Sequence, residues 1–185
     1  MTGVSNLAAG TWEQASAMVG QTLARTTGPD PVNEPDIRRK LEVIGWDCPL
    51  HYDAQTAREH GYRTIVSPAS MTRVWTIQSY WSPGQERIGA ELMSTPLPAT
   101  LVPGKGDTLI ATNVRLEYHE PVYPGDRITA VAVLKSVERK TTRIGPGAFF
   151  VVETKYENQH GEVVAVETAT LFRFHGSSGG DDGAR

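Results

Sequence analysis

One short segment of the sequence combines residue types that can move protons. His51 follows Asp47 by four residues, and Cys48 lies between them. A histidine and a carboxylate that share one water molecule can act as general base and general acid. For each residue a structural role stays open as the alternative to catalysis. His51 would then be a polar residue at the start of a helix, and Asp47 would be a solvated loop residue. Cys48 as a nucleophile would need a lowered pKa and a base, and nothing else in the sequence supports a thiol enzyme.

Two short helices are predicted to flank this segment. Asn33 is a suitable cap for the first helix, which ends at Gly45. Asp53 is a suitable cap for the second helix, which covers about residues 54–60. His51 is therefore expected in a turn between the two helices, where its ring can be exposed.

The stretch 67–81 predicts a third helix of unusually apolar character. Ser67 is a good cap, Pro68 suits the first helical position, and Arg73 is the only charged residue. A helix this apolar is normally enclosed by other structure. The polar, proline-rich stretch 85–105 that follows is longer than most loops, so it is expected to be functional or mobile.

The second half of the sequence reads as antiparallel strands. Val114, Leu116 and Tyr118 alternate with polar residues, which predicts one buried and one wet face. Further strands are expected at Gln21–Thr27, Ile128–Leu134, Phe150–Tyr156 and Val163–Phe174. Helices followed by a run of strands favour an α+β class, with a sheet packed on a buried helix.

Length and composition narrow the class of protein. The 185 residues suit one compact domain, and a net charge of −3 makes nucleic acid an unexpected partner. We expect an N-terminal extension at 1–20, one domain at 21–175 and a disordered tail at 176–185. The single cysteine fits a reducing cytosol. No apolar run reaches the roughly 20 residues that cross a bilayer, and no signal peptide is evident. A cytoplasmic protein without a membrane partner is expected.

Metal and nucleotide sites are not predicted. His119, His160 and His175 have no metal-ligand spacing with other histidines or cysteines. No glycine-rich phosphate loop or dinucleotide fingerprint is present.

Two segments together resemble a known family. The runs Gly45–Ala57 and Tyr118–Asp126 are similar to the active-site and strand–turn–strand segments of the MaoC-like, R-specific enoyl-thioester hydratases, which are related to FAS1-type dehydratase domains. The resemblance covers roughly residues 32–174. It implies a single hot-dog fold, a curved antiparallel sheet wrapped around one long apolar helix. Residues 31–35 and 65–68 look most similar to subunits of actinobacterial heteromeric enoyl-CoA hydratases.

The resemblance also implies a reaction, the hydration of an enoyl-CoA thioester or the reverse dehydration. His51 would be the base. The family places an Asp five residues before this histidine, but Trp46 stands there, so Asp47 is the nearest replacement. Backbone N–H groups of Ala69 and Ser70 would bind the thioester oxygen. The expected acyl-pocket residues are Trp46, Met71 and Trp75. In the alternative interpretation, Met71 and Trp75 pack in the hydrophobic core and do not line the pocket. Water is the co-substrate, so no separate cofactor is expected.

The family pairs two hot-dog units and binds substrate at their interface. The resemblance therefore implies a homodimer, or a heteromer with a second MaoC-like subunit, acting on an acyl-CoA or acyl-carrier-protein thioester. One alternative is a non-catalytic subunit that shapes the acyl pocket of a catalytic partner. Another is an acyl-CoA thioesterase, whose chemistry usually needs a carboxylate on or near the central helix, and the stretch 67–80 has none.

Overall fold

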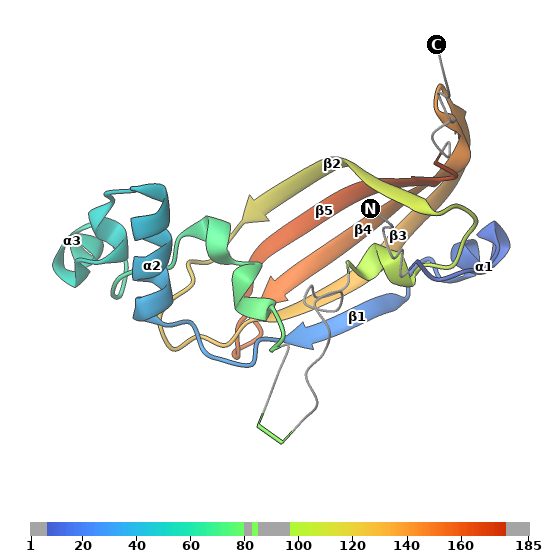
Figure 1. The fold of residues 1–185 in the computed structure, drawn as a ribbon. Coiled ribbons are helices and arrows are strands. Elements are labelled where there is room, and N and C mark those ends of the chain that lie inside the picture. Colours follow the sequence, from blue (N-terminus) through green and yellow to red (C-terminus); the bar gives the residue numbers. More distant parts are fainter. Residues whose placement is uncertain (1–6, 80–82, 85–96, 177–185) are drawn as a thin grey trace, which may run out of the picture.

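A computed structural model describes residues 7–79, 83–84 and 97–176 of the chain. Figure 1 shows a curved sheet with helices gathered at its two ends. All five strands are antiparallel, in the order β1-β3-β4-β5-β2. The strands are β1 (Thr22–Thr27), β2 (Thr108–Tyr118), β3 (Thr129–Thr142), β4 (Gly145–Glu157) and β5 (Val163–Phe174). The predicted α+β class is confirmed.

In the described residues, three α-helices accompany the sheet, namely α1 (Trp12–Ala17), α2 (Glu34–Ile44) and α3 (Ala54–Glu59). The Asn33 side chain accepts the Asp36 N–H at 2.9 Å, and Gly45 closes α2 with a left-handed φ of 60°. Asp53 accepts N–H groups from the first turn of α3. Both predicted caps are therefore confirmed. Among the residues described, no helix has the length and apolar character that a membrane span requires.

The third predicted helix is wrong as a continuous helix. The structure has two 3₁₀ turns there, η2 (Ala69–Met71) and η3 (Val74–Thr76). The hydroxyls of Thr72 and Thr76 donate to the carbonyl three residues earlier, at 2.8 and 2.9 Å. Such local bonds compete with the backbone bonds of an α-helix. Tyr80 and Trp81, the end of the predicted helix, lie outside the described residues. Over its described part, this segment does not give the sheet the long helix that the resemblance implies.

Two core clusters form at opposite ends of the sheet instead. At one end, Trp12 of α1 packs with Leu134 and Phe150 of the sheet. At the other end, Ile37 of α2 packs with Tyr156 of β4. Figure 1 shows α1 and α2 at these opposite ends. The middle of the sheet therefore lies between two separate apolar cores.

Strand β2 forms one edge of the sheet and departs from its predicted burial. Val114, Leu116 and Tyr118 are 49, 38 and 49 % exposed. The prediction that these side chains are buried is therefore wrong for the single chain. The reason is position, because an edge strand packs only where another element covers it. Leu116 lies opposite Glu167 in β5 and Val114 lies opposite Ala169. These apolar side chains therefore share a face of the sheet with Glu167 and Ala169.

Candidate active site

His51 is held in a defined orientation and tautomer. It ends η1 (Pro49–His51), a 3₁₀ turn between α2 and α3, and it is only 7 % exposed rather than in the open. Its Nδ1 lies 2.8 Å from the carbonyl oxygen of Val66. Because a carbonyl only accepts, Nδ1 carries the proton and donates it, which leaves Nε2 of the neutral ring unprotonated. The ring is therefore set up to act as a base through Nε2.

The carbonyl that orients His51 belongs to a segment held from both sides. The Val66 N–H donates to Leu50 O at 3.0 Å, and the Ser67 N–H donates to Val122 O at 2.8 Å. Turn η1, the segment 65–67 and the stretch after β2 are thereby joined by backbone hydrogen bonds. The position of His51 depends on contacts between segments far apart in the sequence.

A buried carboxylate anchors the stretch after β2. Asp126 is 2 % exposed and accepts the Tyr123 N–H at 2.8 Å and Arg63 Nη2 at 3.0 Å. The Arg63 guanidinium also lies 4.0 Å from the centre of the Tyr123 ring. Sequence reasoning identified Asp126 only as part of a family motif. It missed Arg63, because no local signal connects residues this far apart in the chain.

The predicted carboxylate does not reach His51. Trp46 packs on the imidazole instead, with ring centroids 4.8 Å apart and the planes tilted by 58°. Asp47 accepts a hydrogen bond from the Tyr52 hydroxyl at the surface. This bond favours the protonated phenol and raises the pKa of Tyr52. In the part of the chain that the structure describes, no hydrogen bond joins Asp47 to His51.

The other predicted site residues divide between surface and core. Ala69 and Ser70 are exposed at the start of η2, where the first N–H groups of a turn have no partner within it. Met71 and Trp75 are 3 and 6 % exposed and belong to the core cluster under α2. The Trp75 indole N–H donates to Ser67 Oγ at 2.9 Å, which ties it to the segment beside His51.

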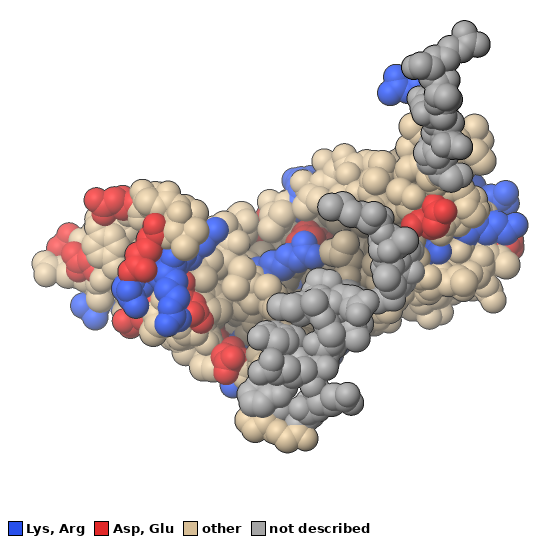
Figure 2. All heavy atoms as spheres, viewed as in Figure 1, with Lys and Arg blue, Asp and Glu red and all other residues tan. Residues whose placement is uncertain are grey.

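A hollow lies on the sheet itself, between the two core clusters. It is a cavity of about 270 Å³, and Figure 2 shows this face hollowed in the middle of the molecule. Alanines contribute much of its wall because their small side chains leave space above the sheet. The lining residues from the strands include Ala24, Ala130, Ala132, Val152, Ala169 and Leu171. Ile77 and Pro98 also line it.

One side of this cavity is polar. The Tyr156 hydroxyl donates to Glu167 Oε2 at 3.0 Å, and Arg73 Nη1 lies 3.9 Å from Glu167 Oε1. Burial raises the pKa of Tyr156 far above its ordinary value, and the Glu167 charge adds to the shift. The phenol therefore stays protonated and acts as a donor. Sequence reasoning missed Glu167, although its place in the last predicted strand, among alternating aliphatic residues, was a usable signal.

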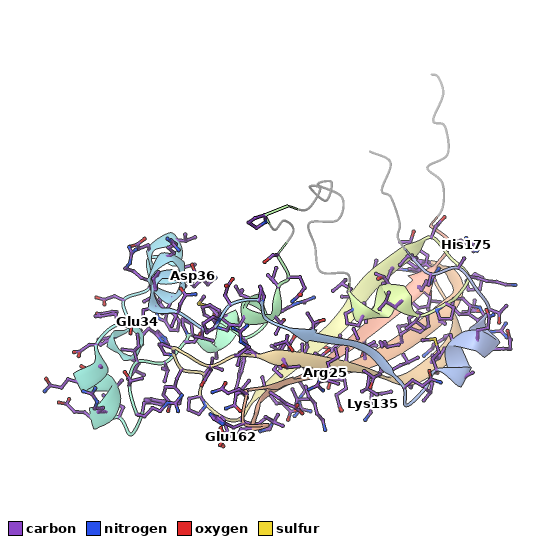
Figure 3. The ribbon with its side chains drawn as sticks, turned by 90° about the horizontal axis from the view of Figure 1, so that it is seen from below. Arg25, Glu34, Asp36, Lys135, Glu162 and His175 are labelled. Atoms are coloured by element: carbon purple, nitrogen blue, oxygen red, sulfur yellow. The ribbon has the colours of Figure 1, made fainter. Side chains whose placement is uncertain are left out.

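Figure 3 places His175 at the opposite end of the molecule from Glu34 and Asp36. Within the described ranges, no group of three or more His, Cys, Asp or Glu could hold a metal ion.

The curved antiparallel sheet is that of a hot-dog protein. The chain belongs to the family of the FAS1-like dehydratase domain region, whose model matches residues 17–167. It is 36 % identical over 167 residues to a probable enoyl-CoA hydratase alpha subunit of Thermomonospora curvata, covering 88 % of this chain and 51 % of that protein. It is 31 % identical over 164 residues to the 3-oxo-4,17-pregnadiene-20-carboxyl-CoA hydratase alpha subunit of Mycobacterium tuberculosis, covering 86 % and 47 %. The chain thus spans about half the length of the curated relatives it matches.

Solved structures agree with this assignment. A chain of the ChsH1-ChsH2 complex from Mycobacterium tuberculosis is similar with a TM-score of 0.69 and 27 % identity, covering 90 % of this chain and 95 % of that one. The (R)-hydratase from A. caviae involved in PHA biosynthesis has a TM-score of 0.56 at 18 % identity, covering 83 % and 94 %. At this level of identity, the similarity to the (R)-hydratase shows a shared fold and no more.

Proposed function

We propose that the chain is a hot-dog subunit of an enoyl-CoA hydratase, or of a 3-hydroxyacyl-thioester dehydratase in the reverse direction. The observation that carries the proposal is the alanine-lined cavity on the sheet. The family resemblance implies a long helix against the sheet, and the structure has two 3₁₀ turns there instead. Two relatives named as hydratase alpha subunits support the reaction. The proposed substrate is an acyl-CoA thioester of lipid or steroid side-chain metabolism, and water is the co-substrate.

The proposed reaction adds water across the double bond next to the thioester. The water oxygen bonds to the β-carbon, and a proton is delivered to the α-carbon while charge passes through the thioester oxygen. His51 Nε2 is the proposed base, since its Nδ1–H is already engaged by Val66 O. The exposed N–H groups of Ala69 and Ser70 are the proposed donors to the thioester oxygen. In this structure Asp47 is bonded to Tyr52, so a role as the acid requires it to leave that partner.

The proposed acyl site is the cavity, not the predicted trio of Trp46, Met71 and Trp75. Ligand pockets are mostly apolar, occupy about 300–1,000 Å³ and carry a few placed polar groups. The cavity of about 270 Å³ is close to the lower end of this range and has an apolar wall with one polar side. Its size and lining suit a long or ring-containing acyl group.

A second candidate function is a non-catalytic subunit that shapes the pocket of a catalytic partner. Trp46 favours it, because an indole packs on His51 where a carboxylate is needed. The exposed apolar face of β2 supports pairing with another hot-dog subunit, either a second copy or a different chain. The names of the relatives, alpha subunits and a two-component complex, favour a different chain.

Hydration kinetics separate the two candidates. The chain would be purified alone and together with hot-dog proteins encoded beside it, then assayed with short, long and steroid-derived enoyl-CoA thioesters. His51→Ala is the test variant, and His60→Ala is its matched control. His60 also bonds a carbonyl, Thr56 O at 2.8 Å, but it is exposed on α3.

Turnover that is lost in His51→Ala and kept in His60→Ala would support His51 as the base. Turnover that needs a partner chain and survives His51→Ala would support the non-catalytic candidate. Absence of turnover in every combination would contradict the proposed hydratase function.

A further inference from the structure

The cavity contains a carboxylate that the proposed hydration does not use. Glu167 is 8 % exposed and lies in the interior of β5, with Thr154 opposite it in β4 and Leu116 opposite it in β2. Charged side chains are seldom this buried unless they are paired. Such a group is stabilised when each of its oxygens has a partner, from the protein, a ligand or solvent in the cavity.

Only one oxygen of Glu167 has a hydrogen-bond donor among the described residues. Oε2 accepts the Tyr156 hydroxyl at 3.0 Å. Oε1 faces Arg73 Nη1 at 3.9 Å, which is too long for a hydrogen bond. Arg73 is the residue just before η3, and its side chain is 53 % exposed. The guanidinium thus balances the charge without occupying the acceptor site on Oε1.

The space between Glu167 Oε1 and Arg73 Nη1 suits an oxygen atom that can both donate and accept a hydrogen bond. An oxygen at about 2.8 Å from both Glu167 Oε1 and Arg73 Nη1 is geometrically possible for a pair 3.9 Å apart. To satisfy both groups, it must donate to the carboxylate and accept from the guanidinium. A hydroxyl does both, a ketone only accepts, and an ammonium group only donates. The rest of the wall is mostly apolar, which suits a ligand whose remaining part is largely hydrocarbon.

We propose that Glu167 and Arg73 form a recognition site for a hydroxyl group carried on the hydrocarbon part of the acyl ligand, away from the thioester. The inference deepens the proposed function, since it takes the ligand of the cavity to be an acyl group. Tyr156 is a positioning residue in this site, because it holds the carboxylate by Oε2 and leaves Oε1 directed to the ligand. The site selects hydroxylated over plain hydrocarbon acyl groups.

Binding of two saturated thioesters tests the site without any turnover. Decanoyl-CoA and 10-hydroxydecanoyl-CoA differ by one hydroxyl, their flexible chains let that hydroxyl reach the cavity wall, and neither can be hydrated. Dissociation constants of both would be measured by calorimetry for the wild type, Glu167→Gln and Arg73→Met. Glu153→Gln is the matched control, because Glu153 lies in β4 as part of an ion pair with the exposed Lys135 at 3.4 Å.

The expected result is a preference ratio for the hydroxylated thioester that falls about tenfold in Glu167→Gln and in Arg73→Met, since a charged hydrogen-bond partner is lost. The ratio should stay unchanged in Glu153→Gln. Tyr156→Phe should lower the ratio less than Glu167→Gln does. Thermal unfolding of each variant confirms that it is folded.

Two results would overturn the inference. One is a ratio that is the same in the wild type and in folded Glu167→Gln. The other is binding of neither thioester to the wild type. Because the readout is binding, a chain that hydrates nothing and still shows the Glu167-dependent preference would refute the proposed function and leave this site intact. A chain that hydrates enoyl thioesters with no hydroxyl preference would do the reverse.

Discussion

The turn around His51 and the cavity on the sheet are built in opposite ways. His51 is oriented by one backbone group, Val66 O on its Nδ1, and by the Trp46 ring against its face. The cavity is made of side chains from β1, β3, β4 and β5, several of them alanines, together with side chains from the segments 73–77 and 97–99. The turn can therefore keep a fixed chemical group in place, while the cavity can change its ligand through substitutions that leave the backbone intact. If His51 is the base and the cavity holds the acyl group, as proposed, chemistry and ligand selection are separated in this fold.

The largest expected effect comes from placing a carboxylate beside His51. Trp46→Asp puts an acid at the position whose side chain now contacts the imidazole. If His51 is the base, an added acid–base partner should raise hydration of an enoyl-CoA by about a hundredfold. Steady-state kinetics would measure it, with Trp46→Asn as the control of similar size that cannot ionise. Equal hydration rates for the two variants would contradict a role of His51 as the base in this turn.

Loss of the Asp126 anchor tests how strongly the His51 region depends on its supporting segments. Asp126→Ala leaves the Tyr123 N–H and Arg63 without their acceptor. We expect a free energy of unfolding lower by about 2 kcal/mol, because two partly buried donors lose the acceptor they share. Urea denaturation would measure it. Arg63→Ala should cost less, since Arg63 is 58 % exposed, and a larger loss for Arg63→Ala would contradict this account.

The edge strand offers a test of subunit pairing. Leu116→Lys places a charge on the exposed apolar face of β2 and should weaken self-association, or association with a hot-dog partner, about tenfold. Sedimentation equilibrium would report the change. The matched control is Ile144→Lys, because Ile144 is also an exposed apolar residue, 49 % accessible, but lies outside the strands. An unchanged association constant for Leu116→Lys would contradict pairing through β2.

The smallest effect concerns α2, which packs near the His51 turn. Asn33→Ala removes the cap of this helix and should lower the free energy of unfolding by about 1 kcal/mol. The Asn33 side chain also lowers the pKa of Asp36 below its ordinary 3.8. That contribution is fully present above pH 3.8 and is lost as the pH falls through the folded-state value. Asn33→Ala should therefore flatten the acid side of the stability profile, and a profile parallel to the wild type would contradict the coupling.

How far the sequence predicts the fold depends on the distance over which each interaction acts. Asn33 and Gly45 cap α2 through atoms within a few residues, so both ends of that helix are predictable. Strand β5 is bounded as predicted, at Val163–Phe174, because most of its residues are aliphatic or threonine. The stretch 67–81 is not predictable in the same way. Its apolar pattern suits a helix, but Thr72 and Thr76 bond locally and Trp75 bonds to Ser67.

The candidate site shows the same limit. His51 is found from its type and family segment, but its burial and its Val66 partner follow from tertiary packing. Asp47 is close to His51 in sequence and yet bonds Tyr52, because a change of one residue in a turn redirects a side chain. The pairing of Glu167 with Tyr156 follows from the register of β4 and β5, which the sequence alone does not fix.

The most direct test of the central claim is the dependence of hydration on acyl size when the cavity is filled. Ala169→Phe adds a ring to the cavity wall, and Val166→Phe adds the same ring on the opposite face of β5. Values of kcat/KM would be compared for crotonyl-CoA and for a long or steroid-derived enoyl-CoA, in the assembly that shows turnover. We expect Ala169→Phe to lower kcat/KM for the large substrate at least tenfold while crotonyl-CoA is hydrated as before, and Val166→Phe to change neither. Undiminished hydration of the large substrate by folded Ala169→Phe would contradict the claim that the acyl group lies in this cavity.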